Sequence, residues 1–246
     1  MYTDFAKFYD ILMEDADYKG RSEYILSLFD KFGKRPEELL DLACGTGEFS
    51  NEFARHGISV MGVDISEEML CIAKEKSEEQ GNGILYVCQD AVSLDLHGKV
   101  DGAVCLLDSL NHIIDYNDFC KAIERVALFL AEDGLFIFDV NTVYKHRQVL
   151  GDNTFVLEEE GVYCVWQNFY NPQDNTVDIA LDFFEGDGES YKRYSEDITE
   201  RAYTEKEIES ALKKAGLEIL AVYDDMTYNS LKKDSERAIY ITRKIK

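Results

Sequence analysis

The residues with the clearest chemical meaning lie between Leu39 and Phe49, in the run LLDLACGTGEF. An apolar stretch typical of a buried strand carries one carboxylate, Asp41, and leads into a loop with Gly45 and Gly47 that opens a predicted helix. Glycine lets the backbone approach a ligand closely, and the free amides of a helix N-terminus bind polar or anionic groups. The run therefore predicts a site for a small nucleotide-like ligand.

Two further carboxylates follow at the ends of the next two predicted strands. The strand-like run SVMGVD ends at Asp64, and the strand-like run ILYVCQD ends at Asp90. In a doubly wound sheet, the C-terminal ends of the parallel strands line the ligand crevice. We therefore expect Asp41, Asp64 and Asp90 to converge on one elongated ligand.

The spacing of the loop separates three kinds of nucleotide site. A dinucleotide site uses G-x-G-x-x-G, whereas here Gly45 and Gly47 are followed by Ser50 where the third glycine would stand. No lysine follows the loop in the way a P-loop requires, which excludes that phosphate site. A nicotinamide-dependent oxidoreductase on a similar sheet remains a rival, disfavoured by Ser50 and by Asp90.

The pattern D-x-A-x-G-x-G at residues 41–47 resembles the first motif of class I S-adenosylmethionine-dependent methyltransferases, with Ala43 where that motif usually has glycine. VDIS, residues 63–66, resembles the ribose-binding strand end of the family, and CQDA, residues 88–91, resembles its adenine-binding strand end. The chain thus resembles bacterial small-molecule methyltransferases of this class that have an inserted antiparallel sheet.

The resemblance implies S-adenosylmethionine as the cofactor, S-adenosylhomocysteine as its product, and no metal. Asp64 would accept hydrogen bonds from both ribose hydroxyls, and Asp41 would orient the methionine ammonium directly or through water. Charge-assisted hydrogen bonds of this kind are roughly twice as strong as neutral ones. The expected cofactor contacts are Tyr9, Asp41, Ala43, Gly45, Gly47, Asp64, Ile65, Met69, Gln89, Asp90, Ala91 and Leu107.

Several of these residues also have a purely structural alternative. Asp64 precedes Ser66, itself a good N-cap for the next helix, and Asp90 is placed to begin a turn. Ile65 and Met69 are expected to sandwich the adenine, but core packing from a strand end and a helix explains them equally well.

Methyl transfer from a sulfonium is an in-line displacement, so positioning matters more than covalent catalysis. Residues beside the methyl group are expected from LLDSLNHI, residues 106–113, at the end of the fourth strand. The catalytic candidates there are Asp108, Asn111 and His112. His112 would deprotonate a hydroxyl or ammonium nucleophile, although a histidine beside isoleucines is more often structural, and Asp108 also suits the cap of a short turn.

Aromatic residues are concentrated in two segments expected to cover the site. An aromatic-rich helix at residues 5–13 precedes the first strand, and in similar methyltransferases such a helix closes over the cofactor, which makes Tyr9 a lid contact. Tyr163, Trp166 and Tyr203 are candidate substrate contacts, because aromatic faces attract cations such as a sulfonium or a developing ammonium. Packing within the protein core is the alternative for all of these rings.

Hydrophobic periodicity predicts an α/β protein with a Rossmann-like, doubly wound, mostly parallel sheet. Strands are predicted at 38–43, 59–63, 84–88, 99–107 and 134–140, and helices at 47–56, 66–79 and 117–130. After these elements the pattern changes, and residues 153–203 indicate an antiparallel meander inserted between the fifth strand and the last helix.

The parent pattern returns at Thr204, which forms a predicted capping box with Glu207. Strands from Leu217 and Arg237 then resemble the antiparallel hairpin that closes the class I methyltransferase sheet. We divide the chain into a methyltransferase domain, formed by residues 1–140 and 204–246, and an inserted β subdomain, residues 141–203, that covers the substrate side.

Composition limits the partners. The chain has 26 basic and 49 acidic residues, a formal net charge of −23, which opposes binding to nucleic acid and to anionic membranes. No apolar run approaches membrane-spanning length, and the N-terminus lacks the pattern of a signal peptide. We expect a cytoplasmic enzyme with a small-molecule methyl acceptor. N- or O-methylation and the oligomeric state stay open, as does a non-catalytic cofactor-binding or protein-interaction module.

Overall fold

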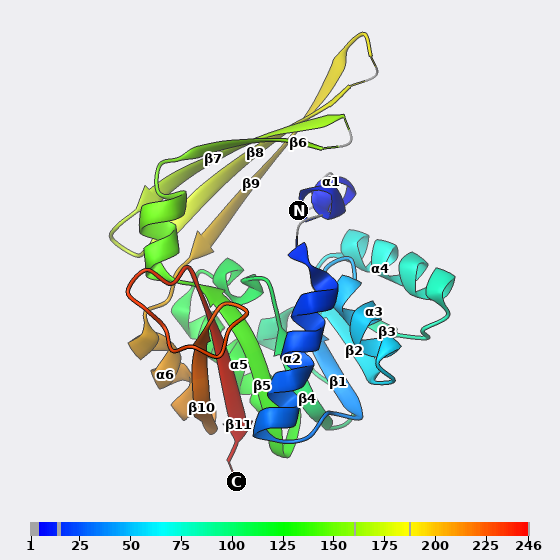
Figure 1. Ribbon diagram of the computed structural model, residues 1–246, viewed down its shortest axis with the longest axis vertical. Helices are drawn as coiled ribbons and strands as arrows, with labels where there is room; N and C mark the ends of the chain where they lie inside the picture. Colours follow the sequence, from blue (N-terminus) through cyan, green and yellow to red (C-terminus); the bar gives the residue numbers. More distant parts are fainter. Residues whose placement is uncertain (1–4, 14–15, 160, 187, 246) are drawn as a thin grey trace.

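The main sheet of the protein has seven strands and the alternating architecture predicted from the sequence. The computed structural model describes residues 5–13, 16–159, 161–186 and 188–245. The strand order is β10-β11-β5-β4-β1-β2-β3, and only β11 runs antiparallel to its neighbours β5 and β10 (Figure 1). The strands are β1 Glu38–Leu42, β2 Ser59–Asp64, β3 Leu85–Cys88, β4 Val100–Cys105, β5 Leu130–Asn141, β10 Leu217–Asp224 and β11 Arg237–Lys244. The predicted fold class is confirmed.

Helices cover both faces of this sheet, because successive strand residues point to opposite sides. Leu39 packs in a cluster with α2 and α3, whereas Leu40 packs in a second cluster with α5 and α6. The helices are α2 Tyr18–Phe32, α3 Glu48–Arg55, α4 Glu67–Gln80, α5 Tyr116–Phe129 and α6 Glu205–Lys214. The capping box predicted between Thr204 and Glu207 is present at the start of α6.

Two elements differ from the prediction. Helix α2 was not predicted, although Ile25, Leu28 and Phe29 are buried at helical spacing on its sheet-facing side. Strand β5 begins at Leu130 instead of residue 134, since Leu130 is buried and pairs with Val100 before the register shifts. Asp133, which lies between the ends of the predicted helix and strand, has a positive φ of 62° and marks an irregularity in β5.

A separate antiparallel sheet follows β5, as the alternating pattern predicted. Its strands pair in sequence order and are β6 Thr154–Glu159, β7 Val162–Asn171, β8 Thr176–Gly186 and β9 Tyr191–Arg201. Val177, Ile179, Leu181 and Phe183 of β8 point to one buried face, which packs against α1, Phe5–Leu12, beneath the sheet (Figure 1). The division into two domains stays a prediction.

Strand β9 connects the insert to the main sheet. Its last residues contact the 3₁₀ turn Ser109–His112, which follows β4. The short π-helix Lys145–Leu150 connects β5 to the insert and packs against β7 and β8. Within the described residues, no helix has both the length and the hydrophobicity needed to cross a lipid bilayer.

Candidate active site

A cavity of about 420 Å³ opens at the C-terminal ends of β1, β2 and β3, where a doubly wound sheet places its ligand. Its wall continues along the 3₁₀ turn Ser109–His112 and is completed by α1. Ten of the residues singled out in the sequence line it: Tyr9, Ala43, Gly45, Asp64, Ile65, Met69, Gln89, Asp90, Ala91 and His112. The structure therefore brings residues from five separate segments to one place.

The glycine loop reaches this cavity in a left-handed backbone conformation. Gly45 and Gly47 have φ values of 54° and 77°, which favour glycine over other residues. A side chain at Gly47 would also place its Cβ 2.5 Å from the hydroxyl of Tyr86. Ala43 shares the left-handed conformation with a φ of 57°, so the residue that departs from the family motif stands where glycine would be unstrained.

Asp64 is held by two backbone donors at the end of β2. The amide of Gly45 donates to its Oδ2 at 2.8 Å, and the amide of Ser66 donates to its Oδ1 at 2.9 Å. Burial raises the pKa of Asp64, and these amides oppose the rise. The hydroxyl of Ser66 accepts from the amide of Met69 and caps α4, so Ser66 is the N-cap of this helix. The Asp64 carboxylate lines the cavity instead.

Asp41 lies behind the glycine loop and is only 2% exposed. Burial raises its pKa to about 7, although the hydroxyl of Ser50 donates a 2.6 Å hydrogen bond that opposes the rise. Asp41 and Leu107 line a smaller cavity of about 20 Å³ that shares Tyr9 and Ala43 with the main one. Tyr18 of the unpredicted helix α2 also lines it.

Asp90 and its neighbours form the far end of the main cavity. Oδ1 of Asp90 accepts from the amide of Val92 at 2.9 Å and caps the 3₁₀ turn Ala91–Ser93, as the structural alternative proposed. The amide of Gln89 donates to the carbonyl of Asp64 and joins the ends of β3 and β2. Ile65 is 59% exposed and Met69 is buried, so the wall here offers both an open and a packed apolar surface.

Asp108 and Asn111 do not line the main cavity. Their polar contacts connect the segment after β4 to β5, β9 and β11. Arg237 of β11 pairs with Oδ1 of Asp108 at 2.7 Å, and the side-chain amide of Asn141 donates to Oδ2 at 2.7 Å. Burial disfavours the charge of Asp108, but Arg237, Lys145 and His112 together outweigh this effect and lower the pKa of the carboxyl. The buried Asn111 side chain donates to the carbonyls of Asn141 and Arg201 and accepts from the amide of Asn141.

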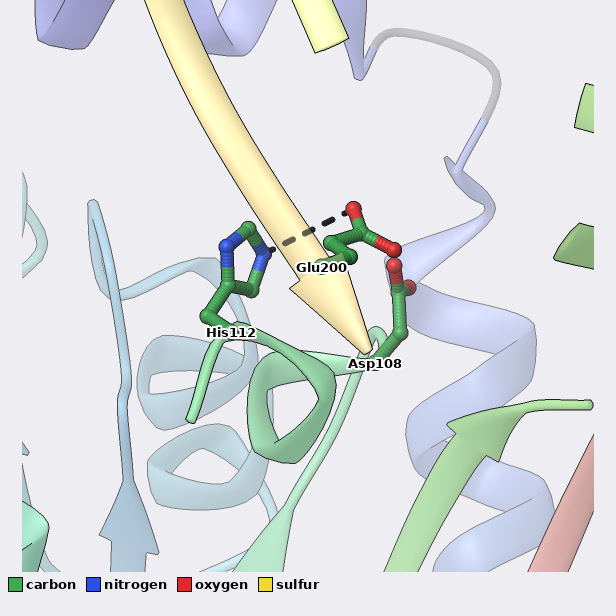
Figure 2. A group of neighbouring side chains, drawn as sticks. All are labelled: Asp108, His112 and Glu200. Carbon is green, nitrogen blue, oxygen red and sulfur yellow. Dashed lines mark ion pairs between the residues drawn. The ribbon is translucent and has the colours of Figure 1, made fainter. Parts of the chain in front are cut away.

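His112 is the one catalytic candidate that lines the main cavity. Its Nε2 faces Oε1 of Glu200 at 3.9 Å, and Asp108 lies beside the same carboxylate (Figure 2). One ligand atom from each of Asp108, His112 and Glu200 lies within 4.8 Å of the others. Glu200 was not predicted, because nothing local distinguishes it from the other acidic residues of the chain.

The predicted substrate contacts lie in three different environments. Tyr203 is buried in the main core, stacks on Phe119 at 4.0 Å and donates its hydroxyl to the carbonyl of Ile113. The indole of Trp166 lies on the inner face of the insert and donates to Asn168. Tyr163 points to the opposite face of the insert, because its neighbour Cys164 is buried on the inner face. Neither the main cavity nor the smaller one is lined by any of these three rings.

Comparison with known proteins agrees with the geometry of this site. The methyltransferase domain family matches residues 39–134. The chain is 34% identical over 247 residues to YqeM of Bacillus subtilis (strain 168), whose name describes it as a methyltransferase; the match covers 100% of this chain and 98% of YqeM. A crystal structure of an S-adenosylmethionine-dependent methyltransferase from Clostridium acetobutylicum ATCC 824 matches with a TM-score of 0.90 and 38% identity, over 99% of this chain and 98% of that one.

A more distant likeness supports the fold alone. The S-adenosylmethionine-bound structure of CalS10, an amino pentose methyltransferase from Micromonospora echinaspora, matches with a TM-score of 0.73 and 19% identity, over 94% of this chain and 96% of that chain. Taken with the full-length matches, the fold and the cavity define a class: the chain belongs to the class I S-adenosylmethionine-dependent methyltransferases. This membership sets aside the oxidoreductase and the non-catalytic module.

Proposed function

We propose that the protein transfers the methyl group of S-adenosylmethionine to a nitrogen or oxygen atom of a small molecule. The observation that carries this proposal is the main cavity, which runs from Asp90 past Asp64 to His112 in about 420 Å³ of space. This volume suits one small-molecule ligand and lies within the range of such pockets. The net charge of −23 disfavours nucleic acid as the acceptor.

The residues present fit S-adenosylmethionine. Gly45, which has a positive φ, presents its backbone to the cavity, whereas Gly47 packs closely against Tyr86 and Ala73 and lets the loop turn there. Asp64, fixed by two amides, has lone pairs left to accept from the ribose hydroxyls. We assign Ile65 and Met69 to the faces of the adenine and the segment 89–91 to its edge.

The methionine end of the cofactor is assigned to residues behind the glycine loop. We assign Asp41 to the methionine ammonium, and Leu107, Tyr9 and Tyr18 to the wall around that group, because these residues share the smaller cavity. Tyr9 belongs to α1, which is pinned to the loop by the Thr46 hydroxyl donating to Asp10 at 2.6 Å. The helix therefore acts as the predicted lid.

When bound, S-adenosylmethionine supplies an electrophilic methyl group on a sulfonium. The protein's own contribution is to orient the acceptor in line and to exclude water, which is worth roughly 7 to 11 kcal/mol of barrier. His112 lines the cavity and accepts the proton that an ammonium or hydroxyl acceptor must lose, which contributes roughly 3 to 5 kcal/mol. Asp108 and Asn111 position the turn that carries His112.

A calorimetric titration tests this function directly. We expect the purified protein to bind S-adenosylmethionine and S-adenosylhomocysteine, and to give no heat with NADH. If the protein bound NADH and gave no heat with S-adenosylmethionine or S-adenosylhomocysteine, the proposal would be overturned. The cytoplasmic location and the role of the insert as a substrate cover remain predictions beside it.

A further inference from the structure

Glu200 is a buried carboxylate beside His112 that has no role in the proposed function. It extends from the end of β9 in the insert and is 6% exposed. Its Oε2 accepts from the side-chain amide of Asn141 at 3.2 Å, and its Oε1 faces Nε2 of His112 at 3.9 Å (Figure 2). That last distance is too long for a hydrogen bond and leaves room for a bridging donor.

Asp108, the other carboxylate beside His112, already has a permanent cation. Arg237 pairs with both Asp108 and Asp139, and it thereby balances much of their charge. Across the described part of the chain, no lysine or arginine forms an ion pair with Glu200. Of the two carboxylates beside His112, Glu200 is therefore the one that has no Lys or Arg partner among the described residues.

His146 lies beside the other oxygen of the same carboxylate. Its side chain is fully buried, and its Nδ1 lies 3.3 Å from the carbonyl of Asn175, which can only accept, so we assign a proton to Nδ1. Its Nε2 lies 3.3 Å from Oε2 of Glu200 and has no hydrogen-bond partner among the described residues. The nitrogen atoms beside Glu200 in the described residues thus belong to His112, His146 and Asn141.

We propose that Asp108, His112 and Glu200 form a subsite for the ammonium group of an amine acceptor, in which Glu200 selects the positive charge. The inference rests on the proposed function and names its acceptor class. Three acceptors that each take a hydrogen bond of about 2.8 Å from one tetrahedral nitrogen lie about 4.6 Å apart. The three side chains offer ligand atoms within 4.8 Å of one another.

The proton balance of this subsite follows from the same contacts. A bound ammonium has no lone pair, so one N–H bond must break before the nitrogen can act as a nucleophile. The proton goes to Nε2 of neutral His112, which becomes an imidazolium, and the electron pair stays on the nitrogen as a neutral amine. The new imidazolium then lies beside Oε1 of Glu200, which stabilises it.

Two small cations probe the subsite without knowledge of the natural acceptor. Methylammonium donates N–H hydrogen bonds, whereas tetramethylammonium has the same charge and no donor. We would follow the binding of each ion to the full-length protein, saturated with S-adenosylhomocysteine, by NMR line broadening. Methylammonium should bind at least about tenfold more tightly than tetramethylammonium, as expected for charge-assisted hydrogen bonds in a part-buried site.

Variants of one strand give the control. Glu200→Gln should abolish the preference for methylammonium and leave the affinity for S-adenosylhomocysteine unchanged. Asp197→Asn removes the same charge from the exposed outer face of β9 and should keep the preference.

Three results would overturn the inference. Equal binding of the two ions by the unaltered protein, or an unchanged preference in Glu200→Gln, would show that Glu200 selects nothing. Stoichiometric zinc that excludes methylammonium would assign the three side chains to a metal instead. If the unaltered protein did not bind S-adenosylhomocysteine at all, that result would differ from the three above. It would overturn the proposed function and the inference with it.

Discussion

The hydroxyl of Ser50 in α3 donates a 2.6 Å hydrogen bond to Oδ2 of Asp41 in β1, and both side chains are buried. Ser50 stands where a dinucleotide-binding loop has its third glycine. The residue that disfavours a pyrophosphate site is thus the one that holds the buried acid in place. Since burial raises the pKa of Asp41 to about 7, its charge changes within the working pH range.

Cofactor affinity should therefore depend on pH. Above pH 7 Asp41 is ionised and attracts the methionine ammonium, and below pH 7 it is protonated and neutral. The affinity for S-adenosylhomocysteine should fall about tenfold between pH 8 and pH 6. Calorimetry across this range measures the effect. In Asp41→Asn the affinity should be weaker and nearly independent of pH, and an equally steep profile in that variant would assign the effect to another group.

The same substitution should stabilise the protein when no cofactor is bound. The folded pKa of Asp41 lies above its ordinary value of 3.8, so the folded state binds more protons between pH 4 and pH 7 and loses stability as pH rises through that window. Asp41→Asn removes this loss, by a few kcal/mol at most. Differential scanning calorimetry should show a higher Tm than wild type at pH 8 and little difference near pH 4. A lower Tm at pH 8 would contradict the buried-charge argument.

Replacing Ala43 by glycine should also stabilise the protein. Ala43 has a φ of 57°, which costs an L-residue roughly 1–2 kcal/mol, partly offset by the greater freedom of glycine in the unfolded chain. We expect a net gain of about 0.5–1 kcal/mol in urea denaturation. Ala122→Gly is the matched control, because Ala122 lies in the interior of α5 and its loss should destabilise by about 1 kcal/mol or more. The same sign for both variants would refute the strain at Ala43.

The lid role of α1 depends on its packing under the insert. Phe8 is buried and stacks on Phe183 with ring centroids 4.7 Å apart, whereas Lys7 forms an exposed ion pair with Glu185. Phe8→Ala should speed the release of S-adenosylhomocysteine at least about tenfold, because Tyr9 on the same helix lines the cavity. Lys7→Ala should change little, since exposed pairs are weak. Stopped-flow dissociation rates would decide, and equal rates in both variants would disprove the lid.

Asp64 should be the strongest single determinant of cofactor binding. Asp64→Asn keeps the shape but removes the charge and faces the Gly45 amide with a weaker acceptor. We expect about a 100-fold loss of affinity for S-adenosylhomocysteine, about 2.7 kcal/mol. Glu67→Gln changes an exposed acid of the neighbouring helix and should have no effect. A loss below threefold in Asp64→Asn would remove the ribose contact from the proposal.

Local patterns were enough to predict that the glycine loop and the ends of β2 and β3 would meet, as they do at the main cavity. Gly45, Gly47 and Asp64 each stand at a strand end or in the loop after it, and the alternation of strands and helices implies which ends meet. The inserted sheet was equally readable, because the period of two in β8 requires one buried face. Helix α2 also has a recognisable pattern in the sequence, the helical spacing of Ile25, Leu28 and Phe29.

Only the tertiary structure decided the acceptor side. Arg237 reaches Asp108 across 129 positions of chain, and Glu200 reaches His112 across 88. Nothing near either residue in the sequence marks its partner, because such pairs are made by how β9 and β11 pack against the end of β4. Tyr203 shows the same limit, since an aromatic residue looks alike in sequence whether it faces a substrate or, as here, stacks on Phe119 in the core. Strand ends follow from local hydrogen bonding and periodicity, whereas long-range contacts depend on the packing of the whole chain.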